Sequence, residues 1–374
     1  MEFLPSNHPL IPPLREEDSL AWLRLLRSRR VGPSTFYRLM AEHGSAEAAL
    51  SALPEIARAA GVDDYSVCPT EVALNEMHRA KLAGATLIAA GSDLYPEALA
   101  DLPDAPPLLW VLGDVSALTR AAVAVVGARN ASSLGLRMAR SLSTGLGDAG
   151  FATISGLARG IDTEVHKATL ATGTVAVMAG GVDVIYPPEN AVLAQEIGEN
   201  GCLVSEQPMG MKPIARHFPR RNRLISGLAR AVVVVEAAAK SGTLITARDA
   251  LDQGREVLAV PGHPFDARAA GCNLLIRDGA TLVRGPKDVL EALHREEQQP
   301  YKAPSPEIAP KRTLIDAHIL HRQILDRLGP SPSTEDQLIR DLGLPAGPVA
   351  DCLTRLELDG AIQREAGGLL RLSC

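Results

Sequence analysis

The sequence predicts an α/β protein built on a doubly wound parallel sheet, and two observations support this. Short continuous apolar runs alternate with amphipathic helical patterns between residues 121 and 293. The 374-residue chain is also rich in hydrophobic residues (46%) but poor in aromatic ones (3%). Aliphatic side chains suit strands that are buried on both faces, and alternating strand and helix patterns indicate a parallel sheet covered by helices.

Each predicted element follows from its own pattern. Continuous apolar runs, typical of buried strands, occupy residues 122–126, 152–154, 175–178, 232–235, 257–260 and 281–283. Helical periodicity occupies residues 133–148, 162–171, 189–199 and 243–253. Two shorter apolar runs upstream, 85–90 and 108–112, are also expected to be strands.

Smaller modules flank this predicted sheet domain, which we place at residues 83–293. Residues 1–82 carry helical patterns separated by the turn Val31-Gly32-Pro33-Ser34, similar to a helix-hairpin-helix or sterile-alpha-motif (SAM) module. A small helical packing domain is an equally good interpretation. Residues 294–312 are polar, contain four prolines and are expected to form a linker. Residues 313–374, with three helical patterns and a Gly-Gly hairpin, predict a winged helix.

The charge of the predicted winged helix bears on its role. Residues 313–374 carry nine acidic and six basic side chains. Its expected recognition helix, 345–359, has Asp351, Glu357 and Asp359 against Arg355 alone. A helix that reads DNA is expected to be basic, so a protein contact or an intramolecular role is favoured over a sequence-specific transcription factor.

Composition excludes several other classes of protein. The five cysteines show no CxxC spacing, so neither disulfides nor a zinc site is indicated. The acidic, proline-rich N-terminus is unlike a secretory signal, and no apolar run approaches the ~18 residues of a membrane span. We therefore expect a cytoplasmic protein without a membrane segment, metal or cofactor. The net charge of -6 argues against non-specific coating of duplex DNA.

A basic segment interrupts this acidic chain. Residues 207–235 contain no acidic side chain but include Lys212 and five arginines, and Phe218 lies among them. Guanidinium groups neutralise phosphates and an aromatic face can stack on a base, a combination suited to single-stranded nucleic acid. A solvated basic helix face, or arginines paired with carboxylates from elsewhere in the fold, explains the charge equally well.

Three glycine-containing turns follow predicted strands at the edge where doubly wound sheets bind ligands. Each offers backbone N–H groups or a cation to a phosphate. The first turn is not a dinucleotide fingerprint, because GxGxxG would require glycines at positions 129 and 132, and both are missing. The second strand also ends without the acidic residue that a dinucleotide site would need. The alternative is that the glycines only turn corners. The candidate residues are Gly127 and Arg129, then Ser155, Gly156 and Arg159, then Lys240, Ser241, Gly242 and Thr243.

Signs of catalysis are weak. His166, His217 and His263 lack ligand-like spacing, and Asp162 is expected to cap a helix. No nucleophile elbow, Walker lysine or HExxH motif is present. The sequence therefore predicts a protein that is not an enzyme.

Several strings in order resemble the DNA processing protein A (DprA/Smf) family: GARNASSLG, SGLARGID, DVIYPPEN, HFPRRNRLISGLA, KSGTLITARDAL, VPGHP and GCNLLIRDGA. The resemblance is dense over residues 83–290. It implies an extended Rossmann fold that forms a homodimer, binds single-stranded DNA and loads the RecA recombinase onto it in natural transformation. The dimer contact would lie around residues 273–283. Leu157 stands where the family commonly has a glycine.

By motif, the resemblance implies a role for individual residues. Arg129, Arg159 and Lys240 with Ser241–Thr243 would bind phosphates. A groove for the strand would be lined by Phe218, Arg220, Arg221, Asn222 and Arg223, with Phe218 as the stacking residue.

Two further functions remain as alternatives. Related Rossmann-like nucleotide hydrolases of the lysine-decarboxylase-like type carry a Gly-Gly-x-Gly-Thr-x-x-Glu loop, whose final Glu is catalytic. Aligning Gly242 and Thr243 with that loop places Thr246 at the Glu position, so no general base is supplied. A sensor that binds a small nucleotide is the other alternative.

Overall fold

The computed structural model describes residues 12–298 and, further on, 317–328, 333–342, 349, 352–353, 356–357, 361–364 and 369–372. The chain divides into two compact units, residues 1–298 and 299–374. The helical module and the sheet domain predicted from sequence thus lie within one unit. Within the described residues, no helix combines the length and the apolar character needed to cross a membrane.

The described residues of the first unit form a nine-stranded sheet in the order β1-β2-β6-β5-β4-β3-β7-β8-β9. The pairs from β6 to β9 are parallel, whereas β1 pairs with β2, and β2 with β6, in antiparallel fashion. This confirms the predicted doubly wound sheet and adds an antiparallel edge to it. The strands are β1 Ala85–Ala89, β2 Leu108–Gly113, β3 Ala122–Val126, β4 Ala152–Ser155, β5 Thr174–Val177, β6 Cys202–Ser205, β7 Ala231–Val234, β8 Glu256–Ala259 and β9 Thr281–Leu282.

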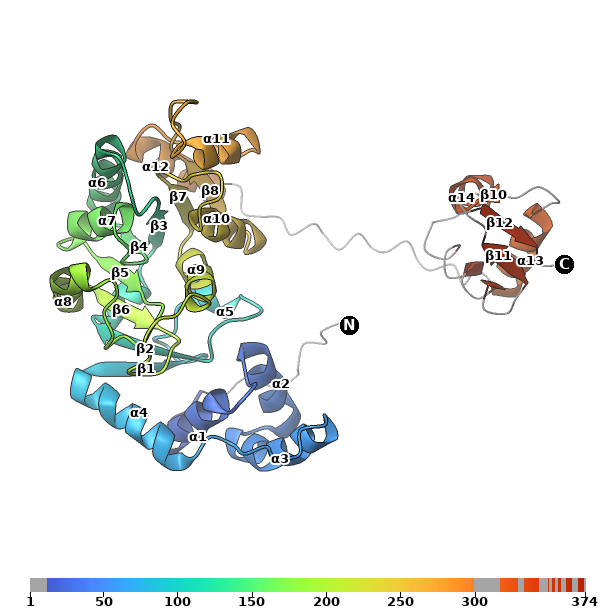
Figure 1. The fold of residues 1–374 in the computed structure, drawn as a ribbon, viewed down its shortest axis with the longest axis horizontal. Coiled ribbons are helices and arrows are strands. Elements are labelled where there is room, and N and C mark those ends of the chain that lie inside the picture. The colour runs from blue at the N-terminus through green and yellow to red at the C-terminus, as the bar shows by residue number, and fades with distance from the viewer. Residues whose placement is uncertain are drawn as a thin grey trace. The chain divides into compact units, whose positions relative to one another are not determined.

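Helices cover both faces of this sheet (Figure 1). One face carries α9 His217–Gly227, α10 Thr243–Asp252 and α11 Ala270–Arg277, and the other carries α6 Ser133–Asp148, α7 Ile161–Thr169 and α12 Pro286–Gln298. The remaining helices of the sheet region are α5 Glu97–Ala100 and α8 Ala191–Asn200, with short 3-10 turns at Val115–Leu118 and Pro188–Asn190. Helix α12 extends into the segment that the sequence predicted as linker.

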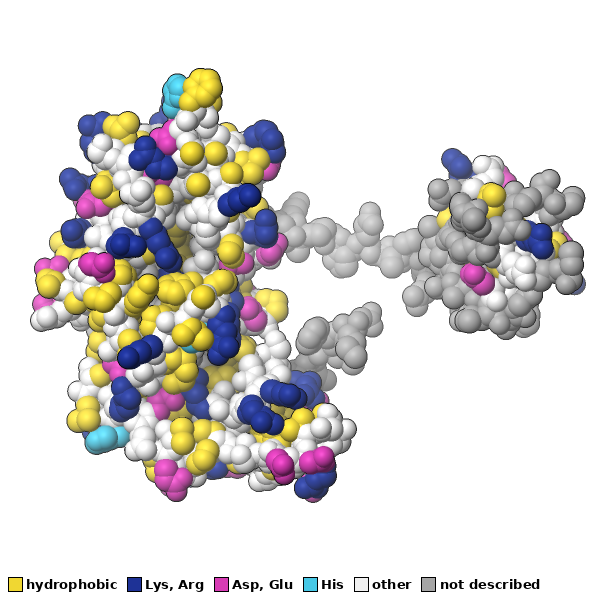
Figure 2. All heavy atoms as spheres, viewed as in Figure 1, with side chains coloured by type: hydrophobic (Ala, Val, Ile, Leu, Met, Phe, Trp, Pro, Cys, Tyr) yellow, Lys and Arg dark blue, Asp and Glu magenta, His cyan; other side chains and the backbone are white. Residues whose placement is uncertain are grey.

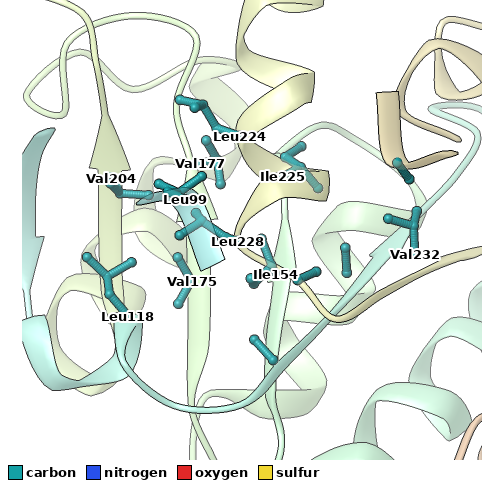
Figure 3. Packing of buried hydrophobic residues seen from close by; sticks show 14 of the residues in the cluster. Leu99, Leu118, Ile154, Val175, Val177, Val204, Leu224, Ile225, Leu228 and Val232 are labelled. Carbon is teal, nitrogen blue, oxygen red and sulfur yellow. The ribbon is translucent and has the colours of Figure 1, made fainter. Parts of the chain in front are cut away.

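The core beneath α9 explains why the basic segment folds as a helix. Leu224, Ile225 and Leu228 recur at helical spacing and are buried. They pack on Val175 and Val177 of β5 and on the neighbouring strands (Figure 3). Burial of this apolar stripe fixes α9 on the sheet, and Arg221 shares the buried face, whereas Arg220 is exposed.

The N-terminal helices lie along the β1 edge of the sheet (Figure 1). They are α1 Glu16–Arg27, α2 Pro33–His43, α3 Ala46–Ala59 and α4 Thr70–Ala83. Trp22 and Leu23 belong to the same buried cluster as Leu108 and Trp110 of β2. Glu76 of α4 accepts a 2.7 Å hydrogen bond from Nε1 of Trp110, so apolar and polar contacts both join these helices to the sheet.

The second unit has its own small core. Its described elements are α13 Ala317–Arg327, α14 Glu335–Leu342 and a three-stranded antiparallel sheet of β10 Ser333–Thr334, β12 Leu369–Leu372 and β11 Ile362–Arg364. Leu320, Ile324 and Leu338 are buried together with Leu353 and Leu370. Helices with a small terminal sheet agree with the predicted winged helix. The expected recognition helix, 345–359, lies largely outside the described residues.

Candidate nucleic-acid interface

A hollow of about 660 Å³ opens at the carboxyl ends of β3 and β7. The strand order reverses between these two neighbours, and such switch points are where doubly wound sheets bind ligands. We call it the switch-point hollow. Figure 2 shows Lys and Arg side chains around the hollowed middle of this face. Of the predicted site residues, its lining includes Gly127, Arg129, Phe218, Arg221, Asn222, Lys240, Ser241, Gly242 and Thr243.

A smaller neighbour, the Tyr186 hollow, has a volume of about 160 Å³. Gly156, Arg159 and Tyr186 line it, and it shares Arg129, Phe218 and Arg221 with the switch-point hollow. The shared residues make the two hollows adjacent parts of one surface. The structure thus brings eleven of the fourteen predicted residues to this surface, leaving Ser155, Arg220 and Arg223 outside both linings.

The turn after β3 rests on the beginning of α7. A Cβ at Gly127 would lie 2.6 Å from Cγ1 of Ile161, so a side chain there would collide with the helix. The amide of Ile161 donates a 3.2 Å hydrogen bond to the carbonyl of Ala128. Gly127 is therefore explained by packing, and the turn holds Arg129 exposed above the sheet.

Arg129 and Phe218 form the centre of the surface. The guanidinium carbon of Arg129 lies 5.3 Å from the centroid of the Phe218 ring. The centroids of the Phe218 and Tyr186 rings are 5.8 Å apart. No carboxylate lies within ion-pair distance of Arg129 in the part of the chain that the structure describes. Its charge is available to an anion, next to a ring that is itself partly exposed.

The turn after β4 uses its backbone amides internally. Oδ2 of Asp162 accepts hydrogen bonds from the amides of Gly156 and Ala158, at 3.2 Å each. The amide of Leu157 donates to Nε2 of His166 at 3.3 Å. Burial lowers the pKa of His166 to about 3, so its neutral ring accepts this bond. These amides are not free to bind a phosphate. The turn contributes the charged side chain of Arg159, which lines the Tyr186 hollow.

Two expectations about this turn are corrected. Asp162 does not cap α7, because the N-cap position belongs to Gly160 and Asp162 lies within the first turn. Ser155 is fully buried, and its hydroxyl donates to the carbonyl of Val125 at 2.8 Å, which gives it a structural role. Leu157 has a φ of 56°, a left-handed conformation that glycine adopts freely, and its buried side chain offsets that strain by packing in the core.

Arg221 fastens α9 to the strand ends beneath the surface. It is 6% exposed, and its Nη1 donates to the carbonyls of Gly156 and Val177, at 2.7 Å each. A Cβ at Gly156 would lie 2.0 Å from that nitrogen, so the glycine makes room for the arginine. Burial lowers the pKa of Arg221 to about 10, partly offset by Asp162. Arg221 forms the floor of both hollows rather than a mobile contact.

The two arginines that flank Arg221, which are Arg220 and Arg223, do not line either hollow. Arg223 is paired with Glu206 and Asp104, and its side chain is 12% exposed. Arg220 is exposed and lines a different hollow beside the N-terminal helices. The expectation that residues 220–223 line one groove is therefore wrong for Arg220 and Arg223. Both interpretations left open by the sequence are partly right, because some arginines are paired and others face solvent.

The turn after β7 supplies a second exposed cation. Lys240 has no carboxylate within ion-pair distance in the described residues. Oγ of Ser241 accepts from the amide of Thr243 at 3.2 Å, and the Thr243 hydroxyl donates to the carbonyl of Gly127 at 3.2 Å. This last bond ties the turn to the one after β3. Gly242 is exposed, and a Cβ there would meet nothing within 4 Å.

The sequence did not single out three residues of this surface. Asn130 and Arg268 line the switch-point hollow, and Tyr186 lines its neighbour. Tyr186 lies inside the DVIYPPEN string, so an aromatic residue in a motif was the signal that could have found it. Arg268 comes from the loop before α11 and is paired with Asp266 at 3.1 Å. Nothing in its local pattern marks it.

The surface offers little for metal or acid–base chemistry. Among the described residues, no group of three or more His, Cys, Asp or Glu side chains is placed to hold a metal ion. Asp162 is the carboxylate in the lining of the switch-point hollow, and it is occupied by two backbone amides. Thr246, at the position of a hydrolase Glu, is 2% exposed. The geometry suits binding of an anion with an aromatic group better than hydrolysis.

A doubly wound sheet with a cationic and aromatic hollow at its switch point defines a Rossmann-like α/β protein. The particular family follows from the comparisons with known proteins. The chain matches the family described as DNA recombination-mediator protein A over residues 86–294. It also matches a DprA-like N-terminal HHH domain over residues 16–79 and a DprA winged helix domain over residues 308–368. The chain belongs to the DNA processing protein A (DprA/Smf) family.

Characterised relatives and solved structures agree with this assignment. The chain is 40% identical to Protein Smf of Escherichia coli over 290 residues, covering 76% of this chain and 77% of the relative. It is 44% identical to DNA processing protein DprA of Streptococcus pneumoniae over 200 residues, or 53% and 71% of the two chains.

Two solved structures share the fold. The crystal structure of Streptococcus pneumoniae DprA matches with a TM-score of 0.55 and 34% identity, covering 70% of this chain and 98% of that one. The Helicobacter pylori protein, whose structure is described as showing a single-stranded DNA binding mode, matches with a TM-score of 0.53 and 27% identity, covering 57% and 96%.

Proposed function

We propose that this protein binds single-stranded DNA across the switch-point hollow and the Tyr186 hollow. The observation that carries the proposal is the guanidinium of Arg129, which lies over the Phe218 ring and forms no ion pair with any described residue. A cation beside an aromatic face matches the alternation of phosphate and base along a single strand. The Helicobacter pylori relative, described as binding single-stranded DNA, supports the same ligand here.

The single strand is favoured over duplex because of the aromatic surface. In a duplex, bases are stacked and paired, so Phe218 and Tyr186 would find no free base face. The phosphate contacts that we propose come from Arg129, Arg159, Lys240 and the turn at Gly242. Arg159 lies 4.0 Å from Glu189, and both side chains are more than 60% exposed, so this weak pair can open when a phosphate binds.

We further propose that the protein acts as a homodimer, protects the strand, and loads RecA onto it in the cytoplasm during transformation or recombination. The dimer contact is proposed at α11 and β9, around residues 273–283. Leu274 and Leu282 are 36% and 43% exposed there. In the described residues β9 pairs with β8 alone, so its second edge is open to another chain.

A sensor for a small nucleotide is the second candidate. The switch-point hollow, at about 660 Å³, falls within the roughly 300–1,000 Å³ typical of small-molecule sites. A hydrolase is disfavoured, because Thr246 replaces the general base and Asp162 is occupied.

Binding of a fluorescent poly-dT strand, its matching duplex and ATP tests these candidates directly. The proposal predicts that the single strand binds more tightly than the duplex, and that ATP competes weakly. Tight ATP binding without binding of the strand would favour the sensor instead.

A further inference from the structure

Helix α9 also borders another cavity, which we call the Gln207 hollow. It has a volume of about 260 Å³ and lies between this helix and the N-terminal helices. Its lining is as polar as it is apolar, and the apolar residues include Val31, Pro33, Pro107 and Met211. Arg220 of α9 lines it, whereas Phe218 and Arg221 of the same helix line the switch-point hollow. One helix therefore reaches both cavities.

The side chain of Gln207 lines this hollow without a hydrogen-bond partner. The residue is 9% exposed. Its backbone amide donates to the Ser205 hydroxyl, but its side-chain amide makes no hydrogen bond within the described part of the chain. Both polar atoms of this side chain stay accessible from the hollow, so they are available to a ligand that enters it. A Gln amide offers one acceptor and two donors, the set that reads the edge of a nucleobase.

Among the charges around the Gln207 hollow, Arg220 stands outside any ion pair with a described residue, although Glu206 of the same lining is within electrostatic reach of it. Arg27 is paired with Glu76 at 2.8 Å, and Glu206 is paired with Arg223. Arg220 is exposed and has no carboxylate within ion-pair distance among the described residues. The N-terminus of α2 also opens here, and its N-cap residue, Gly32, provides no capping side chain. An anion at this rim would be stabilised by both features.

We propose that the Gln207 hollow binds one nucleotide of the same single strand, with its base against Gln207 and the apolar residues of the lining, and its phosphate at Arg220. This inference rests on the proposed function, because it extends the strand across α9 from the switch-point hollow. The volume lies just below the roughly 300 Å³ at which drug-sized sites begin, which suits one base rather than two. The N-terminal helices thereby become part of the DNA-binding surface.

Affinity for short and long dT strands tests the proposal, using the full chain with Gln207→Ala, Arg220→Ala and Arg129→Ala. We expect Gln207→Ala and Arg220→Ala each to lower the affinity for the long strand about fivefold, as for one lost hydrogen bond. The affinity for the short strand should not change. Arg129→Ala should weaken both. The exposed Arg58→Ala is a charge-matched control that should change neither.

The outcomes separate this inference from the proposed function. If Arg129→Ala weakens binding but Gln207→Ala and Arg220→Ala do not, the Gln207 hollow is not on the strand path. If the wild-type protein binds no strand, both proposals fail.

Photo-cross-linking provides a second test that does not depend on the variants folding. A strand carrying 5-iodouracil should cross-link to the peptide that contains Met211. Absence of that cross-link would overturn the proposal. So would its displacement by low concentrations of free dAMP, because the site would then belong to a mononucleotide rather than to the strand.

Discussion

Arg129 and Phe218 meet although 88 intervening residues separate them, with 5.3 Å between the guanidinium carbon and the ring centroid. Arg129 belongs to the turn after β3, and Phe218 to the first turn of α9. The contact holds the arginine over an aromatic face and is worth about 0.5–1 kcal/mol at an exposed site. The guanidinium N–H groups make no hydrogen bond to the described residues, so the pair would join a phosphate site to a stacking site under the proposed function.

Arg129→Ala is expected to reduce both affinity for single-stranded DNA and its dependence on salt. Each neutralised phosphate contributes about 0.7 to the slope of log affinity against log salt concentration for a single strand. Losing one contact should therefore flatten the slope by about 0.7, as measured by fluorescence anisotropy at several salt concentrations. Arg58→Ala should leave the slope unchanged. An unaltered slope in Arg129→Ala would remove this residue from the interface.

Phe218→Ala is expected to cost roughly 1–3 kcal/mol of binding free energy to poly-dT, because a base loses its stacking partner. Phe218→Tyr keeps an aromatic face and should bind nearly as well as the wild type. Titration of a labelled strand measures both variants. Full affinity in a folded Phe218→Ala protein would show that the ring serves packing alone.

Gly242→Ala distinguishes a glycine that lets the ligand approach from one that serves packing. Its φ of -60° suits any residue and a Cβ there would meet nothing within 4 Å, so stability should be unchanged. Affinity for the strand should fall, because the methyl group would occupy the space of a phosphate. Gly127→Ala should instead lower the thermal midpoint, since its Cβ would lie 2.6 Å from Ile161. Unchanged affinity in Gly242→Ala would mean that no phosphate approaches this turn.

Arg223→Ala should destabilise the fold in a pH-dependent way. Burial raises the pKa of Glu206 above its usual 4.5, and Arg223 offsets part of that rise. Without Arg223 the pKa rises further, and an ionised Glu206 is left buried and unpaired. A group whose pKa is raised by folding contributes stability that is present at low pH and lost as pH rises through the folded-state pKa.

The expected cost of Arg223→Ala at pH 8 is therefore about 3–5 kcal/mol in the free energy of unfolding, and it should be smaller at pH 5. Urea denaturation at the two pH values measures it. The double variant Arg223→Ala/Glu206→Gln should recover much of the loss at pH 8. Equal costs at both pH values, with no recovery, would show that the ion pair is not the cause.

Much of the fold could be predicted because its pattern is local. The run at residues 122–126 coincides with β3, and the helical pattern at 133–148 coincides with α6. Strand β6, Cys202–Ser205, was missed, although strands of the same length such as β5 and β7 were predicted. Helix α9 was not assigned because its arginines and proline obscure the buried stripe at Leu224, Ile225 and Leu228.

The site could be predicted only in part, because side-chain direction depends on distant partners. Lys240 and Arg129 follow strands and are exposed at the edge, as the turn pattern indicated. Arg221 and Arg223 look alike in sequence, yet one binds backbone carbonyls and the other Glu206. Those partners come from the turn after β4, from β5 and from the segment after β6, and only the sheet order places them beside α9.

The most direct test of the central claim compares the affinities of a fluorescent poly-dT strand and its matching duplex for the wild type and for Arg129→Glu/Lys240→Glu. Both positions are exposed, so this double variant should fold. We predict that the wild type prefers the single strand and that the double variant loses this binding. Equal binding of strand and duplex, or full strand affinity in the double variant, would contradict a single-strand site at the switch-point hollow.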